Sequence, residues 1–213
     1  MSNGRSLFVK LCGLKTAADV EVAAGAGADA VGFVMTPSVR QLDLNAARRL
    51  VASVPNGVAS VAVFYRPDKS FLATVRDTIP FDYFQAEPES LRGVEGIRAF
   101  PVVHDTEDLE SRVGEAFELA ANRRVLVESS GKGGSGVSPD WGRVATLSRL
   151  SEVVVAGGLT LDNVAETVEI LRPGGVDVSS GIESSRGVKD HGLMKEFVGA
   201  ARQAAARLRK DPV

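Results

Sequence analysis

The sequence predicts an α/β protein, a single-domain (β/α)8 (TIM) barrel that spans residues 1–213. The first reason is a regular alternation of β-rich apolar runs with helical patterns, which favours a parallel sheet. The second is that runs such as 125–127 and 153–156 are continuously apolar, as expected for strands buried on both faces. Eight such runs, about 24 residues apart on average, begin at Leu7, Ala30, Ser60, Phe81, Gly96, Arg124, Val153 and Gly175.

Helical patterns fill most of the intervals between these runs. The first opens at Thr16 with Asp19 three residues later, a capping-box-like start, and the sixth stops at Pro173. The interval after the fourth run is the weakest, because residues 87–93 allow only a short helical turn. The patterns cover residues 16–26, 44–54, 68–78, 107–121, 140–150, 161–171 and 191–209.

An open doubly wound sheet is the structural alternative. It is disfavoured because eight strands are expected and no GxGxxG pattern follows the first of them. No linker interrupts the alternation, and a chain that is 44% hydrophobic is ample for one large core.

The composition narrows the classes of function. The net charge is −2 and most basic residues are scattered, so no nucleic-acid partner is expected. One cysteine, Cys12, and two histidines, His104 and His191, allow no internal disulfide and no Cys/His metal cluster. A reducing, cytoplasmic location is expected. We also expect no signal peptide and no membrane partner, because no apolar run approaches the roughly 20 residues of a membrane span.

In a (β/α)8 barrel the chemistry lies at the C-terminal ends of the strands. Cys12 ends the first strand and is either a thiolate base or nucleophile, or a small buried hydrophobe. Arg40 follows the second strand and is either a bidentate partner for a substrate carboxylate or a surface arginine. Phe64 or Tyr65, after the third strand, would form an apolar wall for an aromatic ligand, although such an aromatic is more often core.

Polar side chains also follow strands four to six. Gln85 and Glu87 alternate to the same side, so one of them is expected to face the mouth of the barrel; a solvated loop carboxylate is the other interpretation of Glu87. His104 is either a proton shuttle or a loop histidine. Glu128 directly follows a buried strand, where partial burial would raise its pKa and suit it to general acid catalysis.

Turns rich in glycine and serine end the last three strands, where barrels of this class bind phosphate. The glycine-rich loop 131–136 is by itself a weak signal. It is strengthened by the turns 157–158 and 180–181, because glycine lets backbone N–H groups approach an oxyanion and the next helix N-terminus adds positive partial charge. The sequence therefore predicts a small phosphorylated substrate.

Together these residues resemble the phosphoribosylanthranilate isomerase family of tryptophan biosynthesis. The resemblance implies a barrel without cofactor or metal. It also implies the conversion of N-(5-phosphoribosyl)anthranilate to 1-(2-carboxyphenylamino)-1-deoxyribulose 5-phosphate by an Amadori rearrangement. The matching segments, taken together in order, are far more specific to the family than any one segment. They are residues 10–14, 27–29 with 32–33, 38 with 40, 61–64, 81–85, 133–136 with 140–141, 156–159, 176–183 and 187–190.

The resemblance assigns roles residue by residue. Cys12 corresponds to the general base, Glu128 to the general acid, and Arg40 to the arginine that pairs with the anthranilate carboxylate. The remaining substrate-binding candidates are Gln85 and Glu87, and a phosphate cradle of Gly134, Ser135, Gly136, Gly157, Gly158, Ser180 and Gly181. Whether the chain is a monomer or a homodimer stays open.

Three positions depart from the family pattern. Glu128 stands in place of an aspartate, which moves the proton donor by about 1.5 Å. Glu87 stands in place of a histidine and would disfavour a nearby substrate carboxylate unless Arg40 offsets it. Val39 replaces a proline beside Arg40. Two alternatives stay open: a paralogue acting on a different phosphoribosylated amine or sugar phosphate in secondary metabolism, and a phosphate-binding barrel without catalysis.

Overall fold

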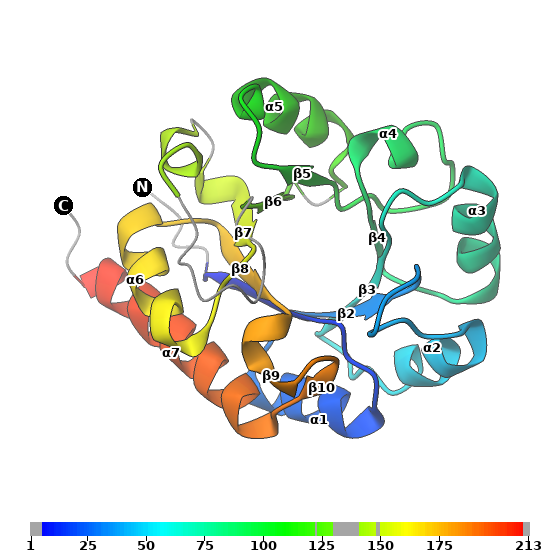
Figure 1. Ribbon diagram of the computed structural model, residues 1–213, viewed down its shortest axis with the longest axis horizontal. Coiled ribbons are helices and arrows are strands. Elements are labelled where there is room, and N and C mark those ends of the chain that lie inside the picture. Colours follow the sequence, from blue (N-terminus) through cyan, green and yellow to red (C-terminus); the bar gives the residue numbers. More distant parts are fainter. Residues whose placement is uncertain (1–5, 122, 130–140, 148–149, 211–213) are drawn as a thin grey trace.

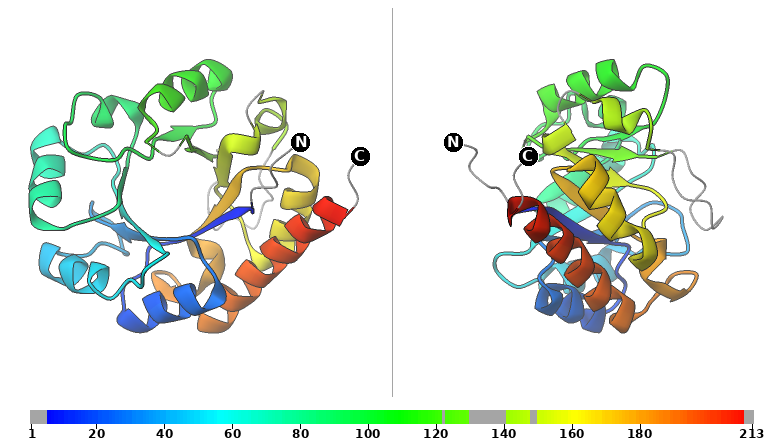
Figure 2. Two further views of the ribbon diagram at one scale, coloured as in Figure 1. Left: turned by 180° about the vertical axis from the view of Figure 1, so that it is seen from behind. Right: turned by 90° about the vertical axis from the view of Figure 1, so that its left-hand side faces the viewer.

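Eight parallel strands form the centre of the computed structural model, which describes residues 6–121, 123–129, 141–147 and 150–210 (Figure 1). The strands neighbour one another in the order β4-β3-β2-β1-β8-β7-β6-β5. The helices lie outside this ring of strands (Figure 2). The strands are β1 (Phe8–Cys12), β2 (Ala30–Val34), β3 (Ala59–Val63), β4 (Tyr83–Gln85), β5 (Val102–His104), β6 (Val125–Glu128), β7 (Val153–Ala156) and β8 (Gly175–Val178).

The ring closes between β4 and the segment that leads into β5. The N–H of Phe84 donates to the carbonyl of Arg98 at 2.9 Å, and the N–H of Phe100 donates back to Phe84 at 2.9 Å. The N–H of Val102 donates to the carbonyl of Ala86 at 3.0 Å. The predicted (β/α)8 barrel is therefore confirmed, with its least regular junction between β4 and β5.

The helices follow the strands in the predicted alternation. At the start of α1 the hydroxyl of Thr16 accepts from the N–H of Asp19 at 3.1 Å, and the carboxylate of Asp19 accepts from the N–H of Thr16 at 3.0 Å. The predicted capping box is thus confirmed. The helices are α1 (Ala17–Ala26), α2 (Leu44–Val51), α3 (Lys69–Thr78), α4 (Pro88–Leu91), α5 (Leu109–Leu119), α6 (Leu161–Leu171) and α7 (His191–Lys210).

Three local features differ from the sequence-based expectations. Among the described residues of 140–150, the chain forms only the 3-10 turns η1 (Val144–Thr146) and η2 (Leu150–Glu152). The backbone N–H groups of Thr146 and Leu147 donate to carbonyls only three residues back, so the segment forms a 3-10 turn rather than an α-helix. Strand β5 begins six residues later than expected, because Gly96 adopts a left-handed conformation and residues 98–102 bond to β4 instead.

The third difference is an antiparallel hairpin after β8, which no sequence pattern indicated. It consists of β9 (Glu183–Ser185) and β10 (Val188–Lys189), and it follows the 3-10 turn η3 (Ser180–Ile182). Figure 1 shows the hairpin in orange, close to α1 and the start of α7.

Two buried layers follow from the strand alternation. Residues such as Val9 and Leu11 pack outward against the helices. The barrel interior holds a smaller apolar cluster of Ala30, Val61, Phe100, Val102, Leu126, Val154 and Ala156. Lys10 alternates with the outward-facing pair on β1 and is fully buried. Among the described residues, none of the helices combines the length and the apolar character that crossing a membrane requires.

Candidate active site

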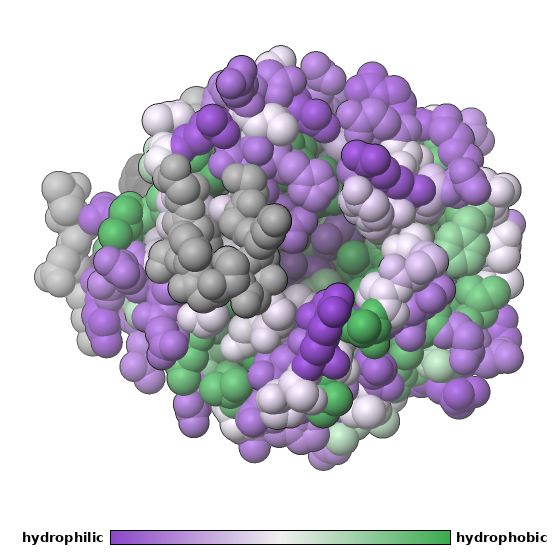
Figure 3. Space-filling model, in the orientation of Figure 1, coloured by the Kyte–Doolittle hydropathy of each residue, from purple (hydrophilic) through white to green (hydrophobic). Residues whose placement is uncertain are grey.

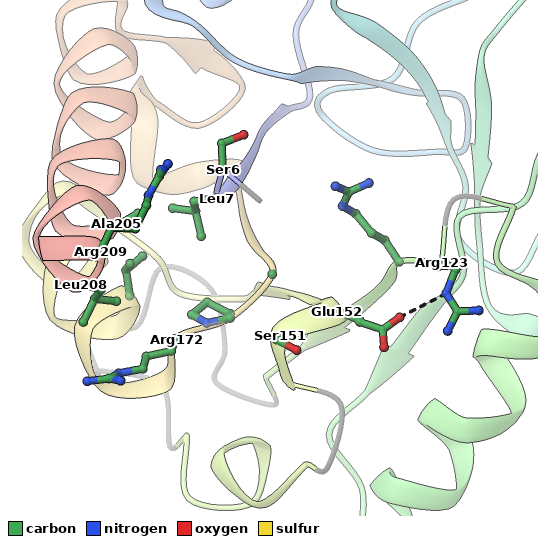
Figure 4. A pocket seen from close by; sticks show the side chains of 13 residues that line it. Ser6, Leu7, Arg123, Ser151, Glu152, Arg172, Ala205, Leu208 and Arg209 are labelled. Carbon is green, nitrogen blue, oxygen red and sulfur yellow. Dashed lines mark ion pairs between the residues drawn. The ribbon is translucent and has the colours of Figure 1, made fainter. Parts of the chain in front are cut away.

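Two hollows lie at opposite ends of the barrel. The larger, about 680 Å³, lies at the N-terminal ends of β1, β6, β7 and β8 and is rimmed by arginines (Figure 4). The smaller, about 360 Å³, lies at the C-terminal ends of the strands, on the face seen in Figure 3. Barrel enzymes keep their chemistry at the C-terminal ends, so we assign the site to the smaller pocket.

The smaller pocket brings together five side chains that the sequence placed on four different strand ends. Cys12 comes from β1, Gln85 and Glu87 from the end of β4, His104 from β5 and Glu128 from β6. The predicted base and the predicted acid therefore line one cavity. The rest of the lining is mostly apolar, and it consists of Val34, Thr36, Pro37, Ser38, Val63, Phe64, Tyr65, Val102, Leu126, Ala156, Asp177 and Ser179.

The base side of the pocket is buried. Cys12 is only 7% exposed, and burial raises the pKa of its thiol. The positive charge of Lys10 opposes this increase. Lys10 is itself held by Asp177, with 2.9 Å between Nζ and Oδ1. The sequence had indicated Cys12 but neither of these partners, since both lie inside apolar strands.

The acid side is more open. The Glu128 side chain is 48% exposed through the mouth of the pocket, yet the surrounding walls desolvate its carboxyl and raise its pKa. His104 lies between two carboxylates, with its Nδ1 atom 3.4 Å from Oε2 of Glu128 and its Nε2 atom 3.9 Å from Oε1 of Glu87. Glu87, and secondarily Glu128, raises the pKa of His104. The imidazolium in turn lowers the pKa of Glu128 from the value that burial alone would give.

Glu87 is not the solvated loop carboxylate of the alternative interpretation. Its side chain is only 10% exposed, and its Oε2 atom accepts a hydrogen bond from the N–H of Arg66 at 3.0 Å. Burial alone would raise the pKa of Glu87, but the contact with His104 and this backbone hydrogen bond bring the pKa below its usual value. Gln85 is buried beside it, and among the described residues its Oε1 atom has no hydrogen-bond partner. That oxygen is available to accept from a bound molecule.

Arg40 lies near the pocket but outside its lining. Its Nε and Nη2 atoms donate to the two oxygens of Glu183 at 2.7 and 2.8 Å. Glu183 also accepts from Lys189 at 2.9 Å, and this set of donors lowers the pKa of Glu183 to about 2 despite burial. The sequence predicted Arg40 but not Glu183, which lies 143 residues away along the chain.

The two predicted phosphate turns lie against each other. Strands β7 and β8 pair in parallel, and a side chain at Gly181 would come within 1.9 Å of the carbonyl oxygen of Leu159. Gly157, Gly158, Ser180 and Gly181 lie next to the pocket residues Ala156 and Ser179 but outside the lining itself. The third part of the predicted cradle, Gly134, Ser135 and Gly136, falls outside the described residues.

A metal centre finds no support in the described part of the chain, where no group of three or more His, Cys, Asp or Glu side chains could hold an ion. The pocket does hold an acidic cluster, but an imidazole separates its carboxylates. The arrangement therefore suits proton transfer by side chains: a buried thiol on one wall, and a carboxyl of raised pKa on another.

Comparison with known proteins decides the family. A family model described as N-(5'phosphoribosyl)anthranilate (PRA) isomerase matches residues 9–200. The chain belongs to this family. The N-(5'-phosphoribosyl)anthranilate isomerase of Nitrobacter winogradskyi is 37% identical to it, over 96% of the chain and 97% of the relative. The predicted resemblance, and with it the prediction of an isomerase, is confirmed.

Solved PRA isomerase structures share the barrel. The crystal structure of the enzyme from Thermotoga maritima has a TM-score of 0.79 at 30% identity, covering 92% of this chain and 99% of that one. A PRA isomerase in complex with reduced 1-(o-carboxyphenylamino)-1-deoxyribulose 5-phosphate has a TM-score of 0.75 at 29% identity, with the same coverage.

Proposed function

We propose that this chain isomerises N-(5'-phosphoribosyl)anthranilate to 1-(2-carboxyphenylamino)-1-deoxyribulose 5-phosphate in tryptophan biosynthesis. Cys12 is the general base and Glu128 the general acid. The observation that carries the proposal is that both side chains line one pocket, at the end of the barrel where this fold keeps its chemistry. Membership of the PRA isomerase family supports the substrate.

The reaction requires one proton donor and one proton acceptor on the two sides of the sugar. Glu128 protonates the ring oxygen, the bond between that oxygen and C1 breaks, and a Schiff base forms. Cys12 then removes the proton from C2, which gives an enolamine. Loss of a proton from the C2 hydroxyl and its gain at C1 give the ketone. Exchange with solvent returns both side chains to their starting states.

The shifted pKa values affect the two roles differently. A raised pKa keeps a larger fraction of Glu128 protonated near neutral pH, which favours an acid. The raised pKa of Cys12 reduces the fraction of thiolate, which disfavours a base. The basic, thiolate form of Cys12 therefore depends on neighbouring groups that stabilise its negative charge.

The ends of the substrate have separate anchors in this proposal. The glycine and serine turns after β7 and β8 bind the phosphate through backbone N–H groups. Arg40, oriented by Glu183, pairs with the anthranilate carboxylate. Phe64 and Tyr65 form the wall beside the aromatic ring, and Oε1 of Gln85 accepts from a substrate hydroxyl or amine.

Complementation tests the activity directly. The gene for this chain should restore growth without tryptophan to a strain that lacks PRA isomerase, while the Cys12→Ala variant should not. The purified chain should also convert the substrate to the ribulose product, measured by mass spectrometry. Folded wild-type protein that neither complements nor turns over the substrate would refute the proposal and favour a different phosphoribosylated amine.

A further inference from the structure

A charged pair lies buried inside the barrel beneath the thiol. The Lys10 side chain is 0% exposed, and its Nζ atom lies 2.9 Å from Oδ1 of Asp177. Lysine is among the residues least often fully buried, and removing two charges from water is costly. The neighbouring interior positions are apolar. A buried ion pair is weak grounds for stability, so its position calls for another explanation.

The register of the strands sets the position of the pair. Lys10 lies directly opposite Asp177 on β8, and Cys12 lies directly opposite Gly32 on β2. Lys10 and Cys12 are two residues apart on β1, so their side chains point to the same side of the strand. The ammonium thus lies one layer below the thiol.

Gly32 provides the space that lets the two groups approach. A Cβ atom at this position would lie 2.8 Å from Sγ of Cys12 and 3.1 Å from Nζ of Lys10. Both atoms therefore border the same small volume, which glycine leaves open. Any larger residue at position 32 would enter the space between the thiol and the ammonium.

In the described part of the chain, four charged side chains interact electrostatically with the thiol. Lys10 from β1 lowers the pKa of Cys12, Asp177 from β8 raises it by a smaller amount, and Lys189 from β10 lowers it. Arg40, from the loop after β2, also interacts with the thiol. Lys10 remains charged, because Asp177 and Cys12 together outweigh the effect of burial and raise the pKa of its ammonium.

We infer that Lys10, held in place by Asp177, is a positioning residue that stabilises the thiolate of Cys12. The inference rests on the proposed function in one respect, namely that this thiolate is the base. Asp177 keeps the ammonium charged and fixed, and Lys10 has the largest stabilising effect on the thiolate among the described cations. The pair thereby compensates in part for the burial that otherwise keeps the thiol protonated.

The single cysteine of the chain makes the inference measurable without any substrate. The thiolate absorbs ultraviolet light, so its titration is obtained by subtracting the spectrum of the Cys12→Ser variant at each pH. The test compares wild type with the double variant Lys10→Met/Asp177→Asn, which removes both charges and leaves neither unpaired. We expect the pKa of Cys12 to rise by about one to two units.

A second variant and a matched control accompany this measurement. Gly32→Ala places a methyl group between the thiol and the ammonium, and it should raise the pKa of Cys12 in the same direction by less. The control, Arg202→Met/Asp29→Asn, removes an ion pair at the opposite end of the barrel and should leave the titration of Cys12 unchanged. If folded Lys10→Met/Asp177→Asn and Gly32→Ala proteins both titrate like wild type, the inference is overturned.

Kinetics separate this inference from the proposed function. With phosphoribosylanthranilate as substrate, kcat of the double variant should fall by about tenfold or more near neutral pH, with little change in KM. If wild type does not turn over the substrate but the pKa of the Cys12 thiol shifts as expected in the variants, the proposed isomerase function is refuted and the electrostatic role of Lys10 stands. Turnover in wild type with an unshifted thiol refutes only the role of Lys10.

Discussion

The pocket has two walls that the fold holds in different ways. The base wall is formed by Cys12 with Lys10 and Asp177 beneath it, and the acid wall by Glu87, His104 and Glu128. On the base side, Lys10 and Asp177 come from within β1 and β8 and Cys12 is the last residue of β1, and all three are at most 9% exposed. On the acid side, Glu128 and His104 come from the last residues of their strands and are 48% and 43% exposed. Strand pairing places the backbone of both groups, but burial also confines the side chains of the first, whereas those of the second stay open to solvent.

This difference shows where the site tolerates change. A group set by strand register cannot move without shifting a strand, because a one-residue slip reverses every side chain. An exposed side chain at the mouth of the pocket, such as that of Glu128, has room to lengthen or to change partner. All the departures from the family pattern lie outside the buried group: Glu128 and Glu87 on the acid side, and Val39 beside Arg40.

The largest effect is expected on the base side. Cys12→Ala removes the proton acceptor and should lower kcat by about a thousandfold, within the range for loss of a general base. Affinity for the product should change little, since the phosphate and carboxylate anchors remain. Steady-state kinetics and product binding by calorimetry measure the two quantities. Near-wild-type turnover would remove Cys12 from its role.

Loss of the general acid Glu128 should lower kcat by a smaller factor, because solvent reaches that wall of the pocket. Glu128→Gln keeps the shape but cannot donate the acidic proton, and we expect kcat to fall by about a hundredfold. Glu166→Gln, an exposed carboxyl on α6, is the control and should keep full activity. A loss as large as that of Cys12→Ala would contradict the contrast between the two walls.

Glu128→Asp sharpens the same comparison. If the acid wall tolerates either carboxylic acid, this substitution should keep kcat within about tenfold of wild type, because aspartate retains the acidic proton and is the residue of the family pattern at this position. The measurement is kcat with phosphoribosylanthranilate. A collapse to the level of Glu128→Gln would mean that the wall is adjusted to the longer side chain, and so to its contact with His104.

The sequence predicted the acid wall more completely than the base wall. Gln85, Glu87, His104 and Glu128 were visible because each polar residue directly follows an apolar run. Lys10 and Asp177 lie inside such runs, and only the pairing of β1 with β8 brings them together.

The same reasoning separates the parts of the fold that could be predicted from those that could not. Eight strands and the capping box at Thr16 follow from local patterns. The helix expected at 140–150 and the start of strand five were wrong, because 3-10 backbone hydrogen bonds at Thr146 and Leu147, and pairing with β4, outweighed propensity. Register, long-range ion pairs and the β9–β10 hairpin depend on contacts that no local pattern records.

A smaller effect is expected beside the base wall, at the partner of Arg40. The pKa of Glu183 is lowered to about 2, so its charge stabilises the fold above the unfolded pKa, and this contribution is lost as pH falls from about 4.5 to about 2. Glu183→Gln should therefore cost about 2 kcal/mol of stability at pH 7. Denaturant unfolding should show the gap to wild type narrowing below about pH 4.5. A constant gap would mean that packing, not charge, is lost.

The smallest effect concerns the coupling on the acid wall. Two histidines, His104 and His191, make an NMR titration simple to assign. His104 should titrate above its usual pKa, so its contacts stabilise the fold below about pH 6.5 and this contribution is lost as pH rises through the raised value. Glu87→Gln should lower the pKa of His104 more than Glu128→Gln does. Each change should stay below about one unit, because exposed pairs are screened. If neither variant changes the pKa of His104, then Glu87 and Glu128 are not coupled to it. The acid wall would then lack a coupled charge cluster comparable to the buried pair beneath Cys12.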